Sequence, residues 1–193
     1  MNYKIQNTLD LTNLEKEGTF LEGTGSMVLD HQNKIAYGCL SERLDKLAFA
    51  HWCDKMQFKA ICFNAVDDKS QPIYHTNVMM CMGNEFVVIC LDSIPNEEEK
   101  QIVLTSFKKS NKELITISQD QLNHFAGNML QVFDINEKPH LIMSEQAYIS
   151  LHPAQVKSLE KYNPILPISI PTIEALGGGS TRCMMAEIYL EPA

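Results

Sequence analysis

Three short polar segments of this 193-residue chain contain an acid, an imidazole and a thiol, and each segment directly precedes an apolar run. Glu22 lies in Leu-Glu-Gly-Thr-Gly-Ser, His75 lies in Tyr-His-Thr-Asn, and Cys183 ends Gly-Gly-Gly-Ser-Thr-Arg-Cys. This combination suits nucleophilic catalysis, in which a thiol attacks, an imidazole transfers protons and a carboxylate orients the imidazole. We therefore treat Cys183, His75 and Glu22 as the candidate catalytic residues.

Each candidate also has a structural interpretation. Cys183 is compatible with a buried strand thiol, His75 with a core or loop histidine, and Glu22 with an exposed turn carboxylate. The context of Cys183 favours chemistry, because glycines 177–179 let the backbone approach a ligand and Arg182 is placed to favour the thiolate. The three side chains are also chemically able to bind zinc, but no HxxxH, CxxC or HxxE spacing occurs near them, so we expect no metal.

A repeat of about 51 residues determines where these residues fall. Strand-like runs begin after small or polar tripeptides, at Gly25-Ser26-Met27, Thr76-Asn77-Val78 and Gly127-Asn128-Met129, and a fourth such start is Thr181-Arg182-Cys183. After each of the first three starts, the pattern predicts a hairpin, then a helix, then a third strand. The predicted third strands are 59–66, 113–118 and 165–170, and a further strand is predicted from Cys183 to the C-terminus.

Such strand-strand-helix-strand units are too small to bury their own apolar faces, so several of them must associate. We predict a single α/β domain over residues 1–193, a propeller-type arrangement with helices outside and strands facing a shared axis. Loops at equivalent unit boundaries would then converge at one end of the axis. This arrangement would bring Glu22, His75 and Cys183 to one pocket.

The composition excludes several classes of function. The formal charge is −8, with 16 basic residues scattered among 24 acidic ones, which argues against nucleic-acid binding. No apolar run approaches the ~20 residues of a membrane-spanning helix, and the first thirty residues lack the features of a secretory signal. We therefore expect a cytoplasmic protein with no membrane partner. The six cysteines are expected to be free, and the five other than Cys183 to be buried thiols.

The three polar segments together resemble the arginine deiminase and amidinotransferase superfamily, whose pentein fold is a five-bladed propeller. The similarity covers the whole chain and is greatest to the citrulline-utilisation hydrolases. It implies a covalent mechanism in which Cys183 attacks a guanidino or ureido carbon, His75 transfers protons and Glu22 holds the imidazole. It implies no cofactor. We assign Asn77, Arg182, Gly178 and Gly179 to the binding of a small guanidino or ureido amino acid.

Two features of the chain depart from the family pattern. Relatives that act on guanidinium groups carry Asp two residues after the histidine, where this chain has Asn77, which suits a neutral ureido group such as that of citrulline. The chain also contains about three of the five units, so it looks like the C-terminal part of the family's domain. We expect it to associate with a missing N-terminal segment or a second chain, because an open fragment would expose an unpaired sheet edge.

Two alternatives to the hydrolase remain at this point. An amidinotransferase would use the same residues and differ only in whether an amine or water resolves the adduct. A non-catalytic pentein binding module would have no need of the Glu22, His75 and Cys183 set.

Overall fold

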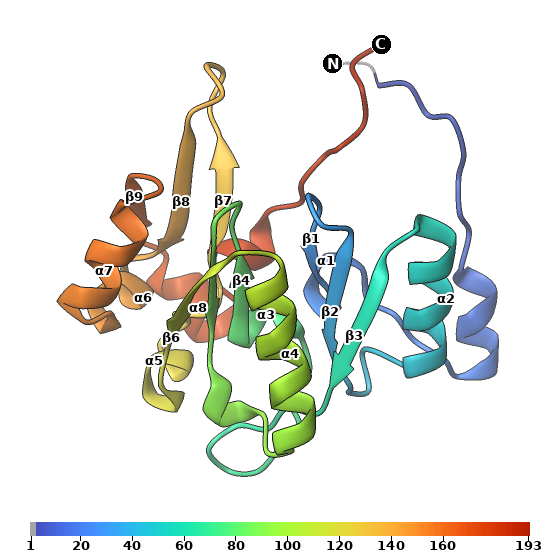
Figure 1. Ribbon diagram of the computed structural model, residues 1–193, viewed down its shortest axis with the longest axis horizontal. Coiled ribbons are helices and arrows are strands. Elements are labelled where there is room, and N and C mark those ends of the chain that lie inside the picture. Colours follow the sequence, from blue (N-terminus) through green and yellow to red (C-terminus); the bar gives the residue numbers. More distant parts are fainter. Residues whose placement is uncertain (1–2) are drawn as a thin grey trace.

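The computed structural model describes residues 3–193 and contains three separate three-stranded sheets, arranged side by side (Figure 1). In every sheet the first two strands form an antiparallel hairpin and the third strand pairs in parallel with the second. The strands are β1 (Val28–Asp30), β2 (Ile35–Cys39), β3 (Lys59–Phe63), β4 (Met80–Met82), β5 (Phe86–Ile89), β6 (Glu113–Thr116), β7 (Leu130–Phe133), β8 (Pro139–Ser144) and β9 (Ile165–Ile168).

Helices connect the second and third strands of every sheet. The described helices are η1 (Thr12–Glu17), α1 (Gly23–Ser26), α2 (Lys46–Met56), α3 (Thr76–Met79), η2 (Leu91–Ser93), α4 (Glu97–Lys109), α5 (Gln119–Asn123), α6 (Glu145–Ser150), α7 (Pro153–Glu160), α8 (Pro171–Gly177) and η3 (Thr181–Met184), where η denotes a 3-10 helix. Asp45 caps α2 by accepting from the backbone N–H groups of Leu47 and Ala48, and Asn96 caps α4 in the same way. The predicted order of strand, strand, helix and strand is therefore confirmed in all three units.

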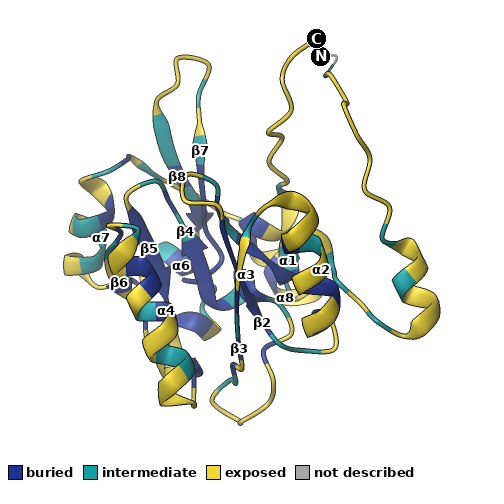
Figure 2. Cartoon of the chain, turned by 45° about the vertical axis from the view of Figure 1, so that its right-hand side comes forward, coloured by how far each residue is buried: buried dark blue, intermediate teal, exposed yellow. Residues whose placement is uncertain are grey.

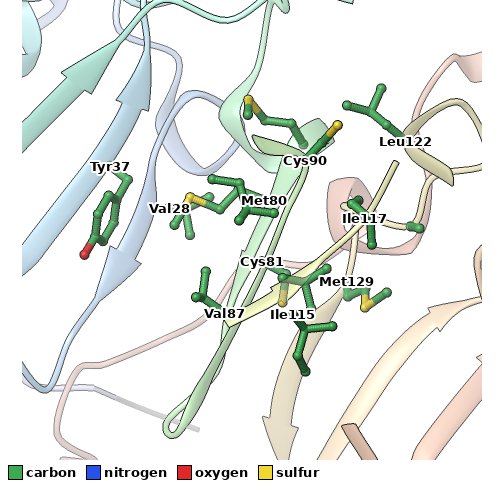
Figure 3. Packing of buried hydrophobic residues seen from close by; sticks show 14 of the residues in the cluster. Val28, Tyr37, Met80, Cys81, Val87, Cys90, Ile115, Ile117, Leu122 and Met129 are labelled. Carbon is green, nitrogen blue, oxygen red and sulfur yellow. The ribbon is translucent and has the colours of Figure 1, made fainter. Parts of the chain in front are cut away.

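The main core lies around the central sheet, whose strand β5 is completely buried along all four residues (Figure 2). Neighbouring sheets meet through their first strands, because β1 contacts β4 and β4 contacts β7. Side chains from these strands, among them Val28 and Met80, pack together in one cluster (Figure 3). This arrangement agrees with the prediction of strands that face a shared interior, with α2 and α4 on the outside (Figure 1).

The units are also joined by a repeated contact at their boundaries. Residues 26, 77 and 128 are equivalent in the repeat, and the backbone carbonyl of each accepts a hydrogen bond from the next unit. Thr76 Oγ1 donates to the carbonyl of Ser26, Asn128 Nδ2 donates to that of Asn77 over 2.9 Å, and Thr181 Oγ1 donates to that of Asn128 over 3.2 Å. The unit boundaries singled out by the sequence pattern therefore lie next to one another in space.

Several predicted strand limits were wrong: the third strands end at Phe63, Thr116 and Ile168, not at residues 66, 118 and 170. The tripeptide 76–78 lies in the helical turn α3, and the strand begins after this turn, at Met80. The strand predicted from Cys183 to the C-terminus is absent from the described structure: η3 occupies Thr181–Met184 and residues 185–190 pair with no sheet. Most apolar residues of this segment are exposed, and the Tyr189 ring stacks on His31 with centroids 3.6 Å apart.

The two ends of the described chain lie side by side (Figure 1), where the backbone N–H of Lys4 donates to the carbonyl of Glu191 over 3.0 Å. Among residues 3–193 no helix has both the length and the apolar character needed to cross a membrane.

Candidate active site

The acid and the imidazole of the predicted site are in direct contact. Glu22 precedes the short helix α1, His75 precedes α3, and these two helices pack against each other. His75 Nε2 donates to Glu22 Oε2 over 2.7 Å, which fixes the ring and leaves Nδ1 as the nitrogen free to accept a proton. A Cβ at Gly25 would lie 2.7 Å from Nδ1, so only glycine leaves room for the ring at this position.

A second partner of Glu22 is the guanidinium of Arg43, which donates to the other carboxylate oxygen. The hydrogen bond from Arg43, followed by that from His75, holds the pKa of Glu22 below its ordinary value against the opposing effect of burial. Glu22 therefore stays ionised beside the imidazole. Sequence reasoning missed Arg43, because it reaches Glu22 only through the antiparallel bridge between Leu21 and Leu44, which no local spacing reveals.

The candidate nucleophile, Cys183, lies at a different unit boundary from Glu22 and His75. Cys183 is exposed on η3, and its sulfur has two amide neighbours: Asn128 Nδ2 at 3.3 Å and Asn77 Nδ2 at 3.9 Å. A Cβ on Gly179 would lie 3.2 Å from the sulfur, so the missing side chain leaves access to it. Gly178 ends α8 in the left-handed region, at φ +68°.

A cavity of about 220 Å³ gives access to the thiol. Cys183, Gly178, Gly179, Asn128 and Tyr74 are among the residues that line it. Tyr74 connects this cavity to the acid/base pair, because its hydroxyl donates to the Gly178 carbonyl over 3.2 Å and its ring lies 4.8 Å from that of His75. Burial, with the charge of Cys183 adding to it, raises the pKa of Tyr74. Tyr74 was not singled out from the sequence, although it lies next to His75.

The predicted residues are not all gathered around one cavity. Glu22 lines a separate hollow of about 710 Å³, together with Phe20 and Arg43. The Arg182 side chain is largely buried and binds the C-terminal segment, with its guanidinium donating to Glu187 Oε2 over 3.1 Å. Its role in substrate binding, like the catalytic roles of the other residues, stays a prediction.

The remaining cysteines differ from Cys183 in their surroundings. Cys39, Cys53, Cys81 and Cys90 are buried free thiols, as predicted, while Cys62 is half-buried. Burial raises the pKa of Cys39 and of Cys53 to about 11, and that of Cys81 to about 12. These three thiols are therefore protonated at neutral pH and are poor nucleophiles.

The fold and these boundary segments define a pentein-fold protein, and comparison with known proteins identifies the family. The sequence profile of the eukaryotic N,N dimethylarginine dimethylhydrolases matches residues 1–190, so the chain belongs to that family. A search of curated proteins gave no match. The predicted superfamily and fold class are thereby confirmed, whereas the number of units in the complete propeller and the nearness to citrulline-utilisation hydrolases are not tested.

Solved structures show the same fold at low sequence identity. An apo arginine dihydrolase from cyanobacteria, ArgZ, is 12% identical with a TM-score of 0.68, and the match covers 89% of this chain and 26% of that one. AgrE in complex with ornithine and NAD+ is 15% identical with a TM-score of 0.68, covering 89% and 24%. The agmatine deiminase of C. jejuni is 16% identical with a TM-score of 0.51, covering 86% and 55%. The chain thus spans between about a quarter and about half of these proteins.

Proposed function

We propose that this chain carries the nucleophile and the acid/base pair of a cysteine-dependent hydrolase that cleaves a C–N bond of a ureido or guanidino compound. The main observation in support of this proposal is the position of Asn77. Its amide lies beside the Cys183 sulfur, and it follows by two residues the histidine that is paired with Glu22. One short segment therefore connects nucleophile and base. The family of the chain and its fold similarity to an arginine dihydrolase and an agmatine deiminase support the same reaction class.

In the proposed reaction, the Cys183 sulfur forms a bond to the planar carbon of the substrate, and the C–N bond then breaks. The leaving nitrogen takes a proton from His75 and departs as ammonia or an amine. The neutral imidazole next removes a proton from water, whose oxygen attacks the thiouronium-type adduct and releases the thiol. Glu22 stabilises the imidazolium that donates this first proton and that forms again when the imidazole takes a proton from water, and it offers an acceptor to a substrate nitrogen. None of these steps uses a cofactor.

Asn77 is the residue that we propose selects the substrate. It is fully buried, and its Oδ1 has no hydrogen-bond partner within the described structure. A buried acceptor without a partner costs free energy, which a substrate N–H would recover on binding. Because a carboxamide is neutral, it suits an uncharged ureido group such as that of citrulline, whereas a guanidinium cation prefers a carboxylate.

The substitution Asn77→Asp tests this selectivity. We expect the unaltered protein to turn over citrulline faster than arginine, and the variant to shift the ratio of kcat/KM values toward arginine by about tenfold or more, because a carboxylate pairs with guanidinium. Asn163→Asp, a buried asparagine whose amide binds Gln131 and Leu159, is the matched control. Faster turnover of arginine by the unaltered protein would contradict the assignment of Asn77.

Labelling with chloroacetamidine tests the nucleophile without depending on turnover. The reagent carries an amidine like that of the proposed substrates and alkylates thiolates, so we expect it to modify Cys183 ahead of the other five cysteines. Peptide mass spectrometry after a short exposure gives the site of modification. Equal labelling of all accessible thiols, or none at Cys183, would favour a binding module that uses the same fold without catalysis.

A further inference from the structure

Asn128 makes the shortest polar contact to the Cys183 sulfur, and the sequence pattern gave it no chemical role. It lies 51 residues after Asn77 at the equivalent position of the next unit, and it is only 1% exposed. Its Nδ2 approaches the sulfur to 3.3 Å. We propose that Asn128 is a catalytic residue that stabilises the Cys183 thiolate with an N–H hydrogen bond and holds the nucleophile in place, an inference that rests on the proposed function of Cys183.

The neighbours of the Asn128 amide fix which of its ends faces the sulfur. Oδ1 accepts from the backbone N–H of Arg182 over 3.1 Å, and Nδ2 donates to the carbonyl of Asn77 over 2.9 Å. A flipped amide would place its oxygen against a carbonyl and its NH2 group against an N–H, and both contacts would be repulsive. The NH2 group must therefore point at the sulfur, where it donates its second hydrogen.

The arginines do not take this role, because both arginines of the chain have carboxylate partners. Arg182, adjacent to the nucleophile, pairs with Glu187, and Arg43 pairs with Glu22. A hydrogen bond from a neutral donor to a charged acceptor is stronger than one between neutral groups, so the Asn128 N–H favours the thiolate over the thiol. Asn77 approaches the sulfur only to 3.9 Å and keeps an oxygen free. The two equivalent asparagines thus differ: Asn128 donates to the nucleophile, whereas the Oδ1 of Asn77 has no partner among the described residues.

The same amide also positions the nucleophile. Its oxygen holds the backbone of Arg182, directly before Cys183, and its nitrogen holds the backbone of Asn77. In addition, the Asn128 carbonyl accepts from Thr181 Oγ1 over 3.2 Å. One side chain therefore couples the nucleophile's helix η3 to the segment that carries the base, and it fixes the distance between them.

The test compares Asn128→Asp and Asn128→Ala with the control Asn163→Asp, whose amide lies in the same unit of the fold but contacts no site residue. The readout is the rate of alkylation of Cys183 by iodoacetamide at pH 7, followed by peptide mass spectrometry. We expect the rate to fall about tenfold or more in both Asn128 variants, because the thiolate loses its donor. The control variant should react at the rate of the unaltered protein.

Unchanged alkylation of Cys183 in a folded Asn128 variant would overturn the inference. If both variants fail to fold, the unaltered protein decides: at pH 6 its Cys183 should react faster than the thiol of glutathione, and an equal or slower rate refutes thiolate stabilisation. Neither measurement uses a substrate. A fast Cys183 without turnover of any ureido or guanidino compound would therefore contradict the proposed function while leaving the role of Asn128 intact.

Discussion

Replacing Lys112 by Met tests how the first and second sheets are held together. The Lys112 ammonium is buried between two hairpins, and its side chain is only 1% exposed. It donates to the carbonyls of Gly83 and Asn84 in the second hairpin, over 3.1 and 2.6 Å, and lies 3.5 Å from the Asp30 carboxylate of the first, which is equally buried. The substitution keeps most of the volume of the side chain and removes its charge.

The expected loss follows from what remains in the structure after the substitution. Asp30 would keep its bonds from Asn33 but lose its ion-pair partner, and the carbonyls of Gly83 and Asn84 would lose their donor. Breaking a buried ion pair by removing one partner costs about 3–5 kcal/mol. A domain of this kind has a total stability of about 5–15 kcal/mol, so the loss is a large share of it.

Urea denaturation followed by circular dichroism measures the free energy of unfolding. In addition to Lys112→Met, we would measure the double variant with Asp30→Asn, which no longer buries an unpaired charge and should recover at least about 1 kcal/mol. Lys109→Met, at an exposed position of α4, is the control and should change stability by less than about 0.5 kcal/mol. A loss in Lys112→Met no larger than in this control would refute the role assigned to the buried ion pair.

Two further predictions concern the acid/base pair. Arg43 lowers the pKa of Glu22, so Arg43→Ala should raise that pKa toward its ordinary value. The acid limb of the plot of kcat/KM against pH should then move to higher pH, while the rate near pH 8 stays unchanged. Acid limbs that coincide in the variant and the unaltered protein would contradict this role of Arg43. Gly25→Ala would place a methyl group 2.7 Å from His75 Nδ1 and should lower kcat about tenfold or more by displacing the ring. The control is Gly23→Ala, whose Cβ meets no atom within 4 Å and which should have no effect. Equal activity of the two variants would refute this reasoning.

Much of the fold was predictable because the repeat carries both periodicity and turn chemistry. The hairpin at 31–34 illustrates this. Asp30 accepts from the backbone N–H of Asn33, and residues of these types are typical of turns, so the sequence indicates the turn. The helices α2 and α4 likewise begin after asparagine or aspartate caps. Local signals of this kind determine the order of elements. They also identified Glu22 and His75, whose contact in space follows from the equivalence of their unit boundaries.

The parts that could not be predicted depend on contacts between distant segments. The apolar run 183–190 is compatible with a strand, but a strand needs the edge of a sheet to pair with. Here the segment is held by side chains instead: Arg182, just before the run, binds Glu187, and Tyr189 stacks on His31. The same limit explains why Arg43 was missed. Asn128 was visible as part of the repeat, but its contact with the sulfur requires the precise approach of two units that the pattern alone does not give.

The three equivalent positions 26, 77 and 128 indicate how a repeated scaffold produces an asymmetric site. At each of them the backbone carbonyl accepts a hydrogen bond from a side chain of the next unit, so the accepting residue's own side chain is not used for this contact. The side chains are then free to differ: Ser26 donates to the backbone of Arg43, Asn77 keeps an unpaired oxygen, and Asn128 donates to the nucleophile. Because the site is built at the junctions between units, changes that loosen those junctions should impair it even when they lie far from the thiol.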